Sequence, residues 1–200
     1  MAIRLHNTLT KTVEDFTPRE DGKVHLFVCG PTVYDFSHLG HAKTYVQLDT
    51  LARVLTHHNY DVFYLQNITD IDDKIITRAH ERNIDWQELR STFQDEYMTD
   101  MTSLNNTSVT QYARATEYID DIITQVEKLI DKGHAYTIEN DGIYFEIATF
   151  PEYGKLSGRS EVKKDDARTR IDESDDKRGW NDFCLWKFSK PGEPVWDAPF

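Results

Sequence analysis

Several features that mark other protein classes are scarce or absent in this sequence. Its 200 residues include two cysteines, Cys29 and Cys184, so a disulfide framework is excluded and both are expected to be free thiols. No apolar run is long enough to cross a bilayer, and the N-terminal segment has no apolar signal core. The formal net charge of -12 argues against a general nucleic-acid-binding surface, although it does not exclude a local basic groove. We therefore expect a cytoplasmic protein that makes no membrane contact.

The apolar pattern of the first third of the chain predicts an α/β fold. Segments 24–29 and 61–66 are apolar on both faces, as buried parallel strands are. Between them, apolar residues recur at helical spacing over 38–58, and Asp35 or Ser37 could cap the start of this helix. A strand, a helix and a strand at this spacing predict a βαβ unit with a right-handed crossover.

Further elements are predicted after this unit. Apolar stripes over 86–104 and 119–130 indicate two amphipathic helices with core-facing sides, the first starting at Asp85 and the second stopping at Gly133. Segment 135–147 is typical of a β-hairpin that turns at residues 140–142, and 182–188 of a short apolar strand. The charge-dense stretch 157–179 is expected to be a surface loop or a partly disordered linker.

Polar residues follow both strands of the predicted βαβ unit. Cys29 and Gly30 end the first strand and lead to the sequence His-Leu-Gly-His at 38–41, while the sequence NITDIDDKI at 67–75 follows the second strand. Ligands of open parallel sheets bind beyond the carboxyl ends of the strands. Both loops are therefore expected to face one crevice.

The His-Leu-Gly-His sequence suits phosphate chemistry. His38 and His41 share one face at a predicted helix start, where unpaired N–H groups and the helix dipole favour anions. Imidazole N–H groups could bond phosphate oxygens as charge develops, and Gly40 would let a base or ribose lie against the backbone. The same residues also fit a solvated helix end, and Cys29 alone also fits a buried structural thiol.

The acidic run after the second predicted strand also allows two interpretations. Asp70, Asp72 and Asp73 could form a metal site, or they could cap and solvate a helix start. We predict capping.

The motifs together resemble those of one enzyme family. The stretch CGPTVYDFSHLGHAK, 29–43, is similar to the signature of cysteinyl-tRNA synthetases, and QNITDIDDKII, 66–76, is similar to their second strand-end motif. RATEYI, KGHAY, YGKLSGR, DDKRGWNDFCLWK and GEPVWDAPF match in the same order further along the chain. The resemblance covers nearly the whole sequence.

The resemblance implies a class I synthetase catalytic core: a Rossmann-type, nucleotidylyl-transferase-like parallel sheet with a helical and β-hairpin insertion. Such enzymes use ATP with Mg²⁺ to convert L-cysteine to cysteinyl-adenylate, then transfer the cysteine to tRNA(Cys). By this resemblance Cys29 is a zinc ligand, His38 and His41 are catalytic, Gly30 and Thr69 contact the amino acid, and Thr32, His38, Gly40 and His41 bind the nucleotide. Lys74 lies in a matching segment. A soft thiolate binds zinc better than a hydroxyl does, so such a site would reject serine without a proofreading domain.

The resemblance also sets expectations for the organisation of the chain. The remaining zinc ligands and the Lys-Met-Ser-Lys-Ser loop are expected beyond Phe200, so the chain is expected to be the N-terminal part of a longer enzyme, with weak zinc binding and poor activity by itself. A natural truncated paralogue is the alternative explanation. The predicted parts are 1–78 (first Rossmann half), 79–159 (insertion) and 160–200 (linker and return strand), in a chain expected to be monomeric.

Two other functions compete with this one. A cysteine-activating paralogue would ligate cysteine to an amino sugar instead of tRNA. A non-catalytic module would keep the crevice and bind nucleotides without chemistry.

Overall fold

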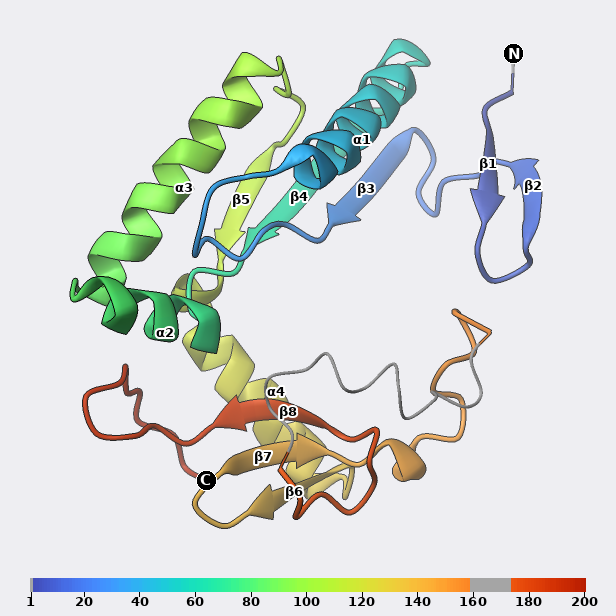
Figure 1. The fold of residues 1–200 in the computed structure, drawn as a ribbon. Helices are drawn as coiled ribbons and strands as arrows, with labels where there is room; N and C mark the ends of the chain where they lie inside the picture. The colour runs from blue at the N-terminus through green and yellow to red at the C-terminus, as the bar shows by residue number, and fades with distance from the viewer. Residues whose placement is uncertain (1, 159–173) are drawn as a thin grey trace. The chain divides into compact units, whose positions relative to one another are not determined.

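The computed structural model describes residues 2–158 and 174–200 (Figure 1). Its contacts divide the chain into two compact units. One consists of Thr17–Ile119, and the other consists of Met1–Phe16 together with Asp120–Phe200. We call the first the parallel-sheet unit and the second the hairpin unit. Every sequence-predicted site residue lies in the parallel-sheet unit. The boundaries at 78 and 159 stay a prediction, and most of the predicted charged loop falls at 159–173, outside the described residues.

The parallel-sheet unit contains the predicted βαβ arrangement. Strands β3 (Lys23–Val28), β4 (Asp61–Ile68) and β5 (Gln111–Arg114) lie in the order β3–β4–β5, and both pairs are parallel. Helix α1 (Leu39–His57) connects β3 to β4, while α2 (Asp73–Arg82) and α3 (Trp86–Ser103) connect β4 to β5. The mixed α/β fold with a parallel sheet is therefore confirmed.

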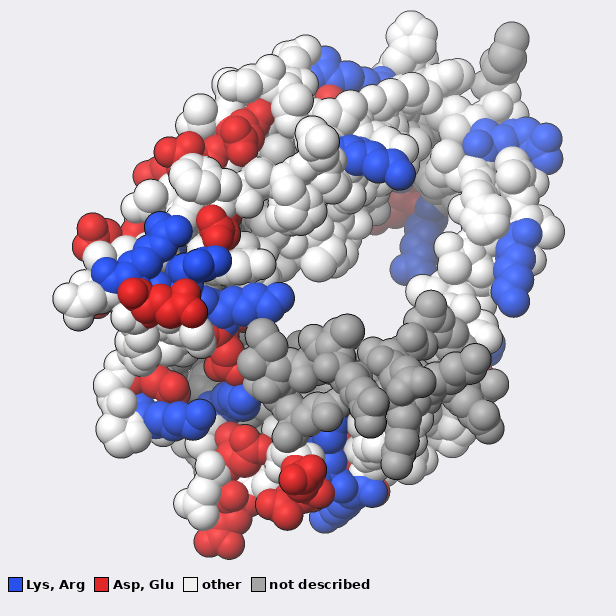
Figure 2. All heavy atoms as spheres, viewed as in Figure 1, with Lys and Arg blue, Asp and Glu red and all other residues white. Residues whose placement is uncertain are grey.

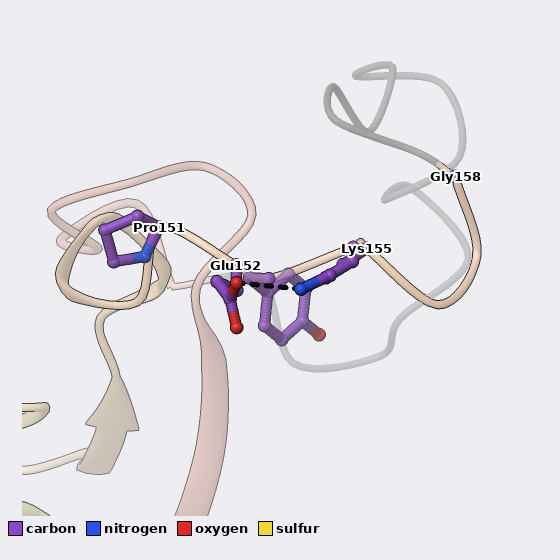
Figure 3. A pocket seen from close by; sticks show the side chains of 6 residues that line it. Pro151, Glu152, Lys155 and Gly158 are labelled. Atoms are coloured by element: carbon purple, nitrogen blue, oxygen red, sulfur yellow. Dashed lines mark hydrogen bonds and ion pairs between the residues drawn. The ribbon is translucent and has the colours of Figure 1, made fainter. Parts of the chain in front are cut away.

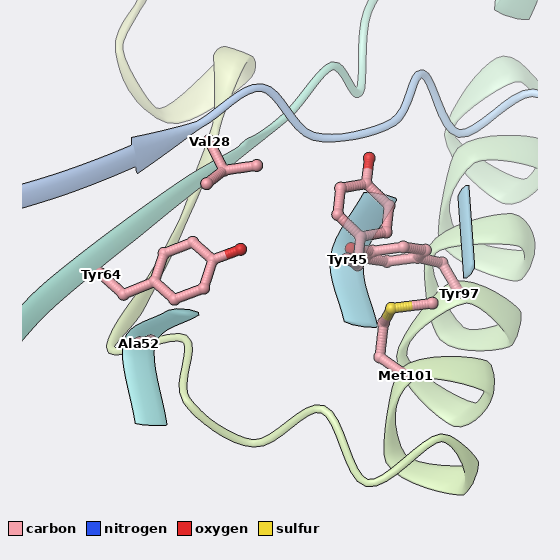
Figure 4. Close-up of a cluster of buried hydrophobic side chains, with 6 residues drawn as sticks. All are labelled: Val28, Tyr45, Ala52, Tyr64, Tyr97 and Met101. Carbon is pink, nitrogen blue, oxygen red and sulfur yellow. The ribbon is translucent and has the colours of Figure 1, made fainter. Parts of the chain in front are cut away.

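The core of this unit lies between the sheet and its helices. One cluster, drawn in Figure 4, joins β3, α1, β4 and α3 through Val28, Tyr45, Ala52, Tyr64, Tyr97 and Met101. Because α1 and α3 contribute to the same cluster, they cover the same face of the sheet. A second cluster joins the loop after β3 to the end of β4, α2 and α3 through Val33, Ile68, Ile75, Ala79, Leu89 and Phe93. The loop that leads to the histidines is thus anchored in the core by Val33.

The N-caps of the helices in this unit agree only in part with those predicted from the sequence. Asp85 caps α3 and Asp72 caps α2, as predicted. The expectation that Asp35 or Ser37 caps α1 was wrong, because His38 is the N-cap. Capping was also wrong for Asp70, which is fully buried.

Asp70 instead connects three parts of the unit. It forms an ion pair with Arg90 of α3 and accepts hydrogen bonds from the backbone N–H of Thr116 (3.0 Å) and from its hydroxyl (2.6 Å). The carboxylate thereby ties the end of β4 to α3 and to the 3-10 turn Ala115–Glu117 that follows β5. The ion-paired carboxylate is a structural link and not a metal ligand.

The hairpin unit contains the predicted hairpin and return strand. Helix α4 (Ile119–Asp131) leads into β6 (Ala135–Ile138), β7 (Gly142–Phe145) and β8 (Phe183–Lys187), which pair antiparallel in that order. A short 3-10 turn, Ile147–Thr149, follows β7. The sequence did not predict the antiparallel pair β1 (Arg4–Asn7) and β2 (Thr12–Asp15), nor β5. These segments have only four residues each, as β6 and β7 do, but no Asn-Asp-Gly turn like that at 140–142 marks them as strands.

The surface agrees with the acidic composition. Figure 2 shows Lys and Arg side chains interspersed with Asp and Glu side chains on the face in view, and not gathered in one broad basic patch. Among the described residues, no helix has both the length and the apolar character needed to span a membrane.

Replacing Asp70 with alanine should lower the free energy of unfolding by about 3 kcal/mol, because Arg90 would lose its buried partner and Thr116 its acceptor. Asp72→Ala is the matched control, since it removes one helix cap and should cost about 1 kcal/mol. Urea unfolding followed by circular dichroism measures both values. Equal losses in the two variants would contradict the role assigned to Asp70.

Candidate functional site

The loops that follow β3 and β4 pair with each other. Thr32 and Thr69 form a parallel β-bridge beyond the ends of the two strands. The N–H of Thr69 donates to the carbonyl of Pro31 (3.0 Å), and the N–H of Val33 donates to the carbonyl of Thr69 (3.2 Å). Thr32 and Thr69, from the two sequence motifs, are therefore neighbours at the carboxyl end of the sheet.

Gly30 is required by the close approach of this turn to β4. A Cβ atom at position 30 would lie 1.7 Å from the carbonyl oxygen of Asn67, so any other residue would force the strands apart. The N–H of Gly30 donates to Oδ1 of Asn67 (2.9 Å), whose Nδ2 donates to the hydroxyl of Thr69 (3.3 Å). Asn67, which we did not single out from sequence, thus connects the two residues predicted to contact the amino acid.

His38 and His41 cap helix α1 reciprocally. Nδ1 of His38 accepts from the N–H of Gly40 (3.0 Å), and Nδ1 of His41 accepts from the N–H of His38 (3.2 Å). This is the geometry of a capping box, with two imidazoles in place of the usual hydroxyl and carboxylate. The rings stack with centroids 3.9 Å apart and an interplanar angle of 18°.

The capping bonds determine which ring nitrogens are left for a ligand. Because each Nδ1 accepts a hydrogen bond, a neutral His38 and a neutral His41 both carry their proton on Nε2. Two N–H donors therefore stand beside the positive end of the α1 dipole, and the first turn of α1 contains no acidic residue. This arrangement suits an anion such as a phosphate group.

Gly40 has a steric role in the same turn. A Cβ atom there would approach Cε1 of His38 to 2.7 Å, so glycine lets the His38 ring fold back over the start of the helix.

Tyr45 brings the cysteine turn and the histidine pair together. Its hydroxyl donates a long hydrogen bond (3.5 Å) to the carbonyl of Cys29, and its ring lies parallel to that of His41 with centroids 6.3 Å apart. Burial, and to a smaller extent the nearby Cys29 thiol, raises the pKa of Tyr45 well above its ordinary value, so the hydroxyl stays protonated as a donor. Cys29 itself is exposed, and the interpretation as a buried structural thiol is wrong.

The described residues do not make a complete zinc centre. Cys29 supplies one thiol, and within residues 2–158 and 174–200 no group of three or more His, Cys, Asp and Glu side chains could hold a metal ion. Four ligands are usual for zinc, with three from the protein when substrate fills the fourth position.

The remaining residues near the site have structural contacts. Nζ of Lys74, at the start of α2, lies 5.5 Å from the centroid of the Tyr34 ring. Gln66 of β4 is buried, and its Oε1 accepts from the hydroxyl of Tyr97 (2.9 Å), while its Nε2 has no partner in the part of the chain that the structure describes. Tyr45, Gln66 and Tyr97 lie within regular apolar patterns, which is why the sequence alone indicated only core positions for them.

A pocket in the hairpin unit contains none of the predicted site residues. Its lining, shown in Figure 3, consists of Pro151, Glu152, Tyr153, Gly154, Lys155 and Gly158. Within it, Lys155 forms an ion pair with Glu152 (2.9 Å). This exposed loop carries no arrangement comparable to the paired strand-end loops.

The capping arrangement should make the start of α1 sensitive to acid. Burial, and secondly the charge of His38, lowers the pKa of His41 below its ordinary value of 6.5. The unfolded chain therefore takes up the proton first as pH falls below 6.5, so the contribution of neutral His41 to stability is full above pH 6.5 and is lost as pH falls through the lowered pKa.

We expect the Cε1–H resonance of His41, assigned by its loss in His41→Asn, to titrate below pH 6.5 in an NMR titration of the folded chain. Titration of His41 at or above 6.5 would show that burial in the folded chain does not favour the neutral ring.

Comparison with protein families matches residues 15–200 to the catalytic domain of class I (C) tRNA synthetases. Curated relatives named cysteine–tRNA ligase include that of Thermoplasma acidophilum, 47% identical over 99% of this chain and 43% of its own length. Those of Thermococcus onnurineus and Pyrococcus furiosus are both 48% identical, over 100% and 99% of this chain and 42% and 41% of their own lengths. The chain thus spans about two fifths of the length of these relatives.

Two solved structures share the fold at lower identity. Methionyl-tRNA synthetase of Mycobacterium tuberculosis, in complex with methionyl-adenylate, has a TM-score of 0.52 and 20% identity over 62% of this chain and 25% of its own. The LeuRS–tRNA–LeuAMS complex of Agrobacterium radiobacter K84 has the same TM-score and identity over 68% of this chain and 18% of its own. With the family match over residues 15–200 and the paired loops formed by its motifs, the chain belongs to the family of class I (C) tRNA synthetase catalytic domains.

Proposed function

We propose that the protein carries the adenylate-forming loops of a cysteine–tRNA ligase. In this reaction the carboxylate of L-cysteine attacks the α-phosphorus of ATP, the bond to pyrophosphate breaks and pyrophosphate leaves. A ribose hydroxyl of the 3′-terminal adenosine of tRNA(Cys) then attacks the carbonyl of the cysteinyl-adenylate, and AMP leaves. One observation carries the proposal: a stacked imidazole pair at a helix N-terminus lies in the same unit as two paired strand-end loops. Support also comes from relatives of that name that are 47–48% identical.

The nucleotide is assigned to the start of α1. His38 and His41 would donate from Nε2 to phosphate oxygens of ATP, whose negative charge increases as the bond to pyrophosphate breaks. Gly40 would take part in nucleotide binding by letting the His38 ring fold over the start of the helix, and Thr32 would contribute its hydroxyl. Mg²⁺ is proposed to accompany ATP, as is usual for nucleotide triphosphates.

The amino acid is assigned to the paired loops. Gly30 and Thr69 would contact cysteine, and both are connected to Asn67 by hydrogen bonds. Cys29, exposed at the same turn, is proposed as one zinc ligand. We also propose that the protein is a cytoplasmic monomer, in keeping with a role in translation.

Calorimetry with a non-hydrolysable cysteinyl-adenylate analogue tests the proposed function. With zinc in excess, the chain should bind this analogue more tightly than the seryl analogue, and His41→Ala should weaken binding by about 10- to 100-fold, the value of a hydrogen bond to a charged group. His57→Ala, at the other end of α1, is the matched control and should bind as the unchanged chain does. Equal affinities for the cysteinyl and seryl analogues would instead favour a non-catalytic nucleotide-binding module.

The proposed metal ligand is tested by comparing the two cysteines. Cys29→Ser should abolish zinc binding, whereas Cys184→Ser should leave it unchanged, because Cys184 is half-buried in β8 and packs against the apolar cluster of the hairpin unit. Competition with a chromophoric chelator measures the affinity. Since one thiol is a poor zinc site, binding by the unchanged chain should be weak. Zinc binding that survives in Cys29→Ser would refute the assignment.

A further inference from the structure

The loop between β3 and α1 is held by an ion pair to helix α2. Nη2 of Arg78 lies 2.6 Å from Oδ2 of Asp35, and about a third of each side chain is exposed. The other carboxylate oxygen of Asp35 accepts from the N–H of Phe36 (2.9 Å). One carboxylate therefore connects the guanidinium of α2 to the loop backbone two residues before His38.

Neighbouring residues of this loop also contact α2 and α3. The buried Val33 packs with Ile75 and Ala79 of α2. The Tyr34 ring lies under Nζ of Lys74, and the Phe36 ring meets the Phe93 ring edge-on with centroids 5.1 Å apart. The apolar contacts locate the loop, while the ion pair with Asp35 adds a directional contact.

Helix α2 is equally connected to the loop after β4. It starts directly after Asp72, which caps it, and Asp72 lies three residues beyond Thr69. In Figure 1, α2 lies at the end of the sheet toward which the strand arrows point. One rigid helix therefore contacts both loops of the candidate site.

We propose that Arg78 is a positioning residue, which holds the His38 loop at a set distance from Thr69 through Asp35. The inference rests on the proposed role of the imidazole pair in binding ATP. Small displacements of a binding group cost large factors in rate or affinity, so loss of the ion pair should act on the site and not only on the fold.

Arg78→Gln tests this positioning role. We expect its dissociation constant for ATP, measured by calorimetry, to rise about tenfold. The ring resonances of His38 and His41 should shift or broaden, while the urea midpoint stays close to that of the unchanged chain. Arg78→Lys keeps the charge and should restore most of the affinity. Glu81→Gln is the matched control, because it removes the charge of the other, longer contact of Arg78 (3.5 Å). It should change neither the dissociation constant for ATP nor the ring resonances.

Asp35→Asn removes the same ion pair from the loop side and must reproduce the effect of Arg78→Gln. The inference is wrong if both variants keep the wild-type ring resonances and the wild-type affinity for ATP. It is also wrong if the variants lose stability while the ring resonances of His38 and His41 do not change. If the unchanged chain binds no ATP, the proposed function fails, and the ring resonances alone still decide whether Arg78 positions the histidines.

Discussion

The contact between Gly30 and the backbone of Asn67 is the constraint on which the candidate site depends. With no Cβ at position 30, the turn after β3 can lie directly against the end of β4. The bridge between Thr32 and Thr69 continues the pairing beyond the regular strands. Two loops that are far apart in the sequence are thereby joined edge to edge, and every other feature of the site is placed relative to this junction.

The histidines show how a single pair of side chains can cap a helix and still leave two ring N–H donors free of the cap. Nδ1 of each ring satisfies a backbone N–H at the start of α1, which would otherwise need another partner. Satisfying it leaves both Nε2–H groups as donors and sets the orientation of the rings. The arrangement depends on neutral imidazoles, since a protonated Nδ1 can no longer accept. The stability of the helix start and the availability of the two donors are therefore coupled at these two residues.

The acidic run after β4 illustrates that residues of one motif can have separate physical roles. Asp70 is buried and paired with Arg90, Asp72 caps α2, and Asp73 lies in the first turn of that helix. Among the described residues, the run is not part of any group of three or more side chains that could hold a metal ion. The motif instead holds α2 in place, and α2 in turn holds the loop that leads to His38.

The sequence by itself determined the elements whose signals are local. The apolar runs of β3 and β4, the helical stripes of α1 and α3 and the turn near Asn140 all appear where they were predicted, because each depends on residues within one or two turns of chain. The motif residues Cys29, Gly30, Thr32, His38, Gly40, His41 and Thr69 could also be named in advance, through the resemblance of their motifs to those of cysteinyl-tRNA synthetases.

Only the tertiary structure decided what depends on residues distant in sequence. Asp70 meets Arg90 and Thr116, Asp35 is occupied by Arg78, and Tyr45 reaches the carbonyl of Cys29 across 16 residues. No periodicity records such contacts, since a partner is chosen by the packing of strands and helices and not by spacing along the chain. The α1 cap was also wrongly predicted, because the helix begins at Leu39 and not at residue 38, which makes His38 the residue that caps it.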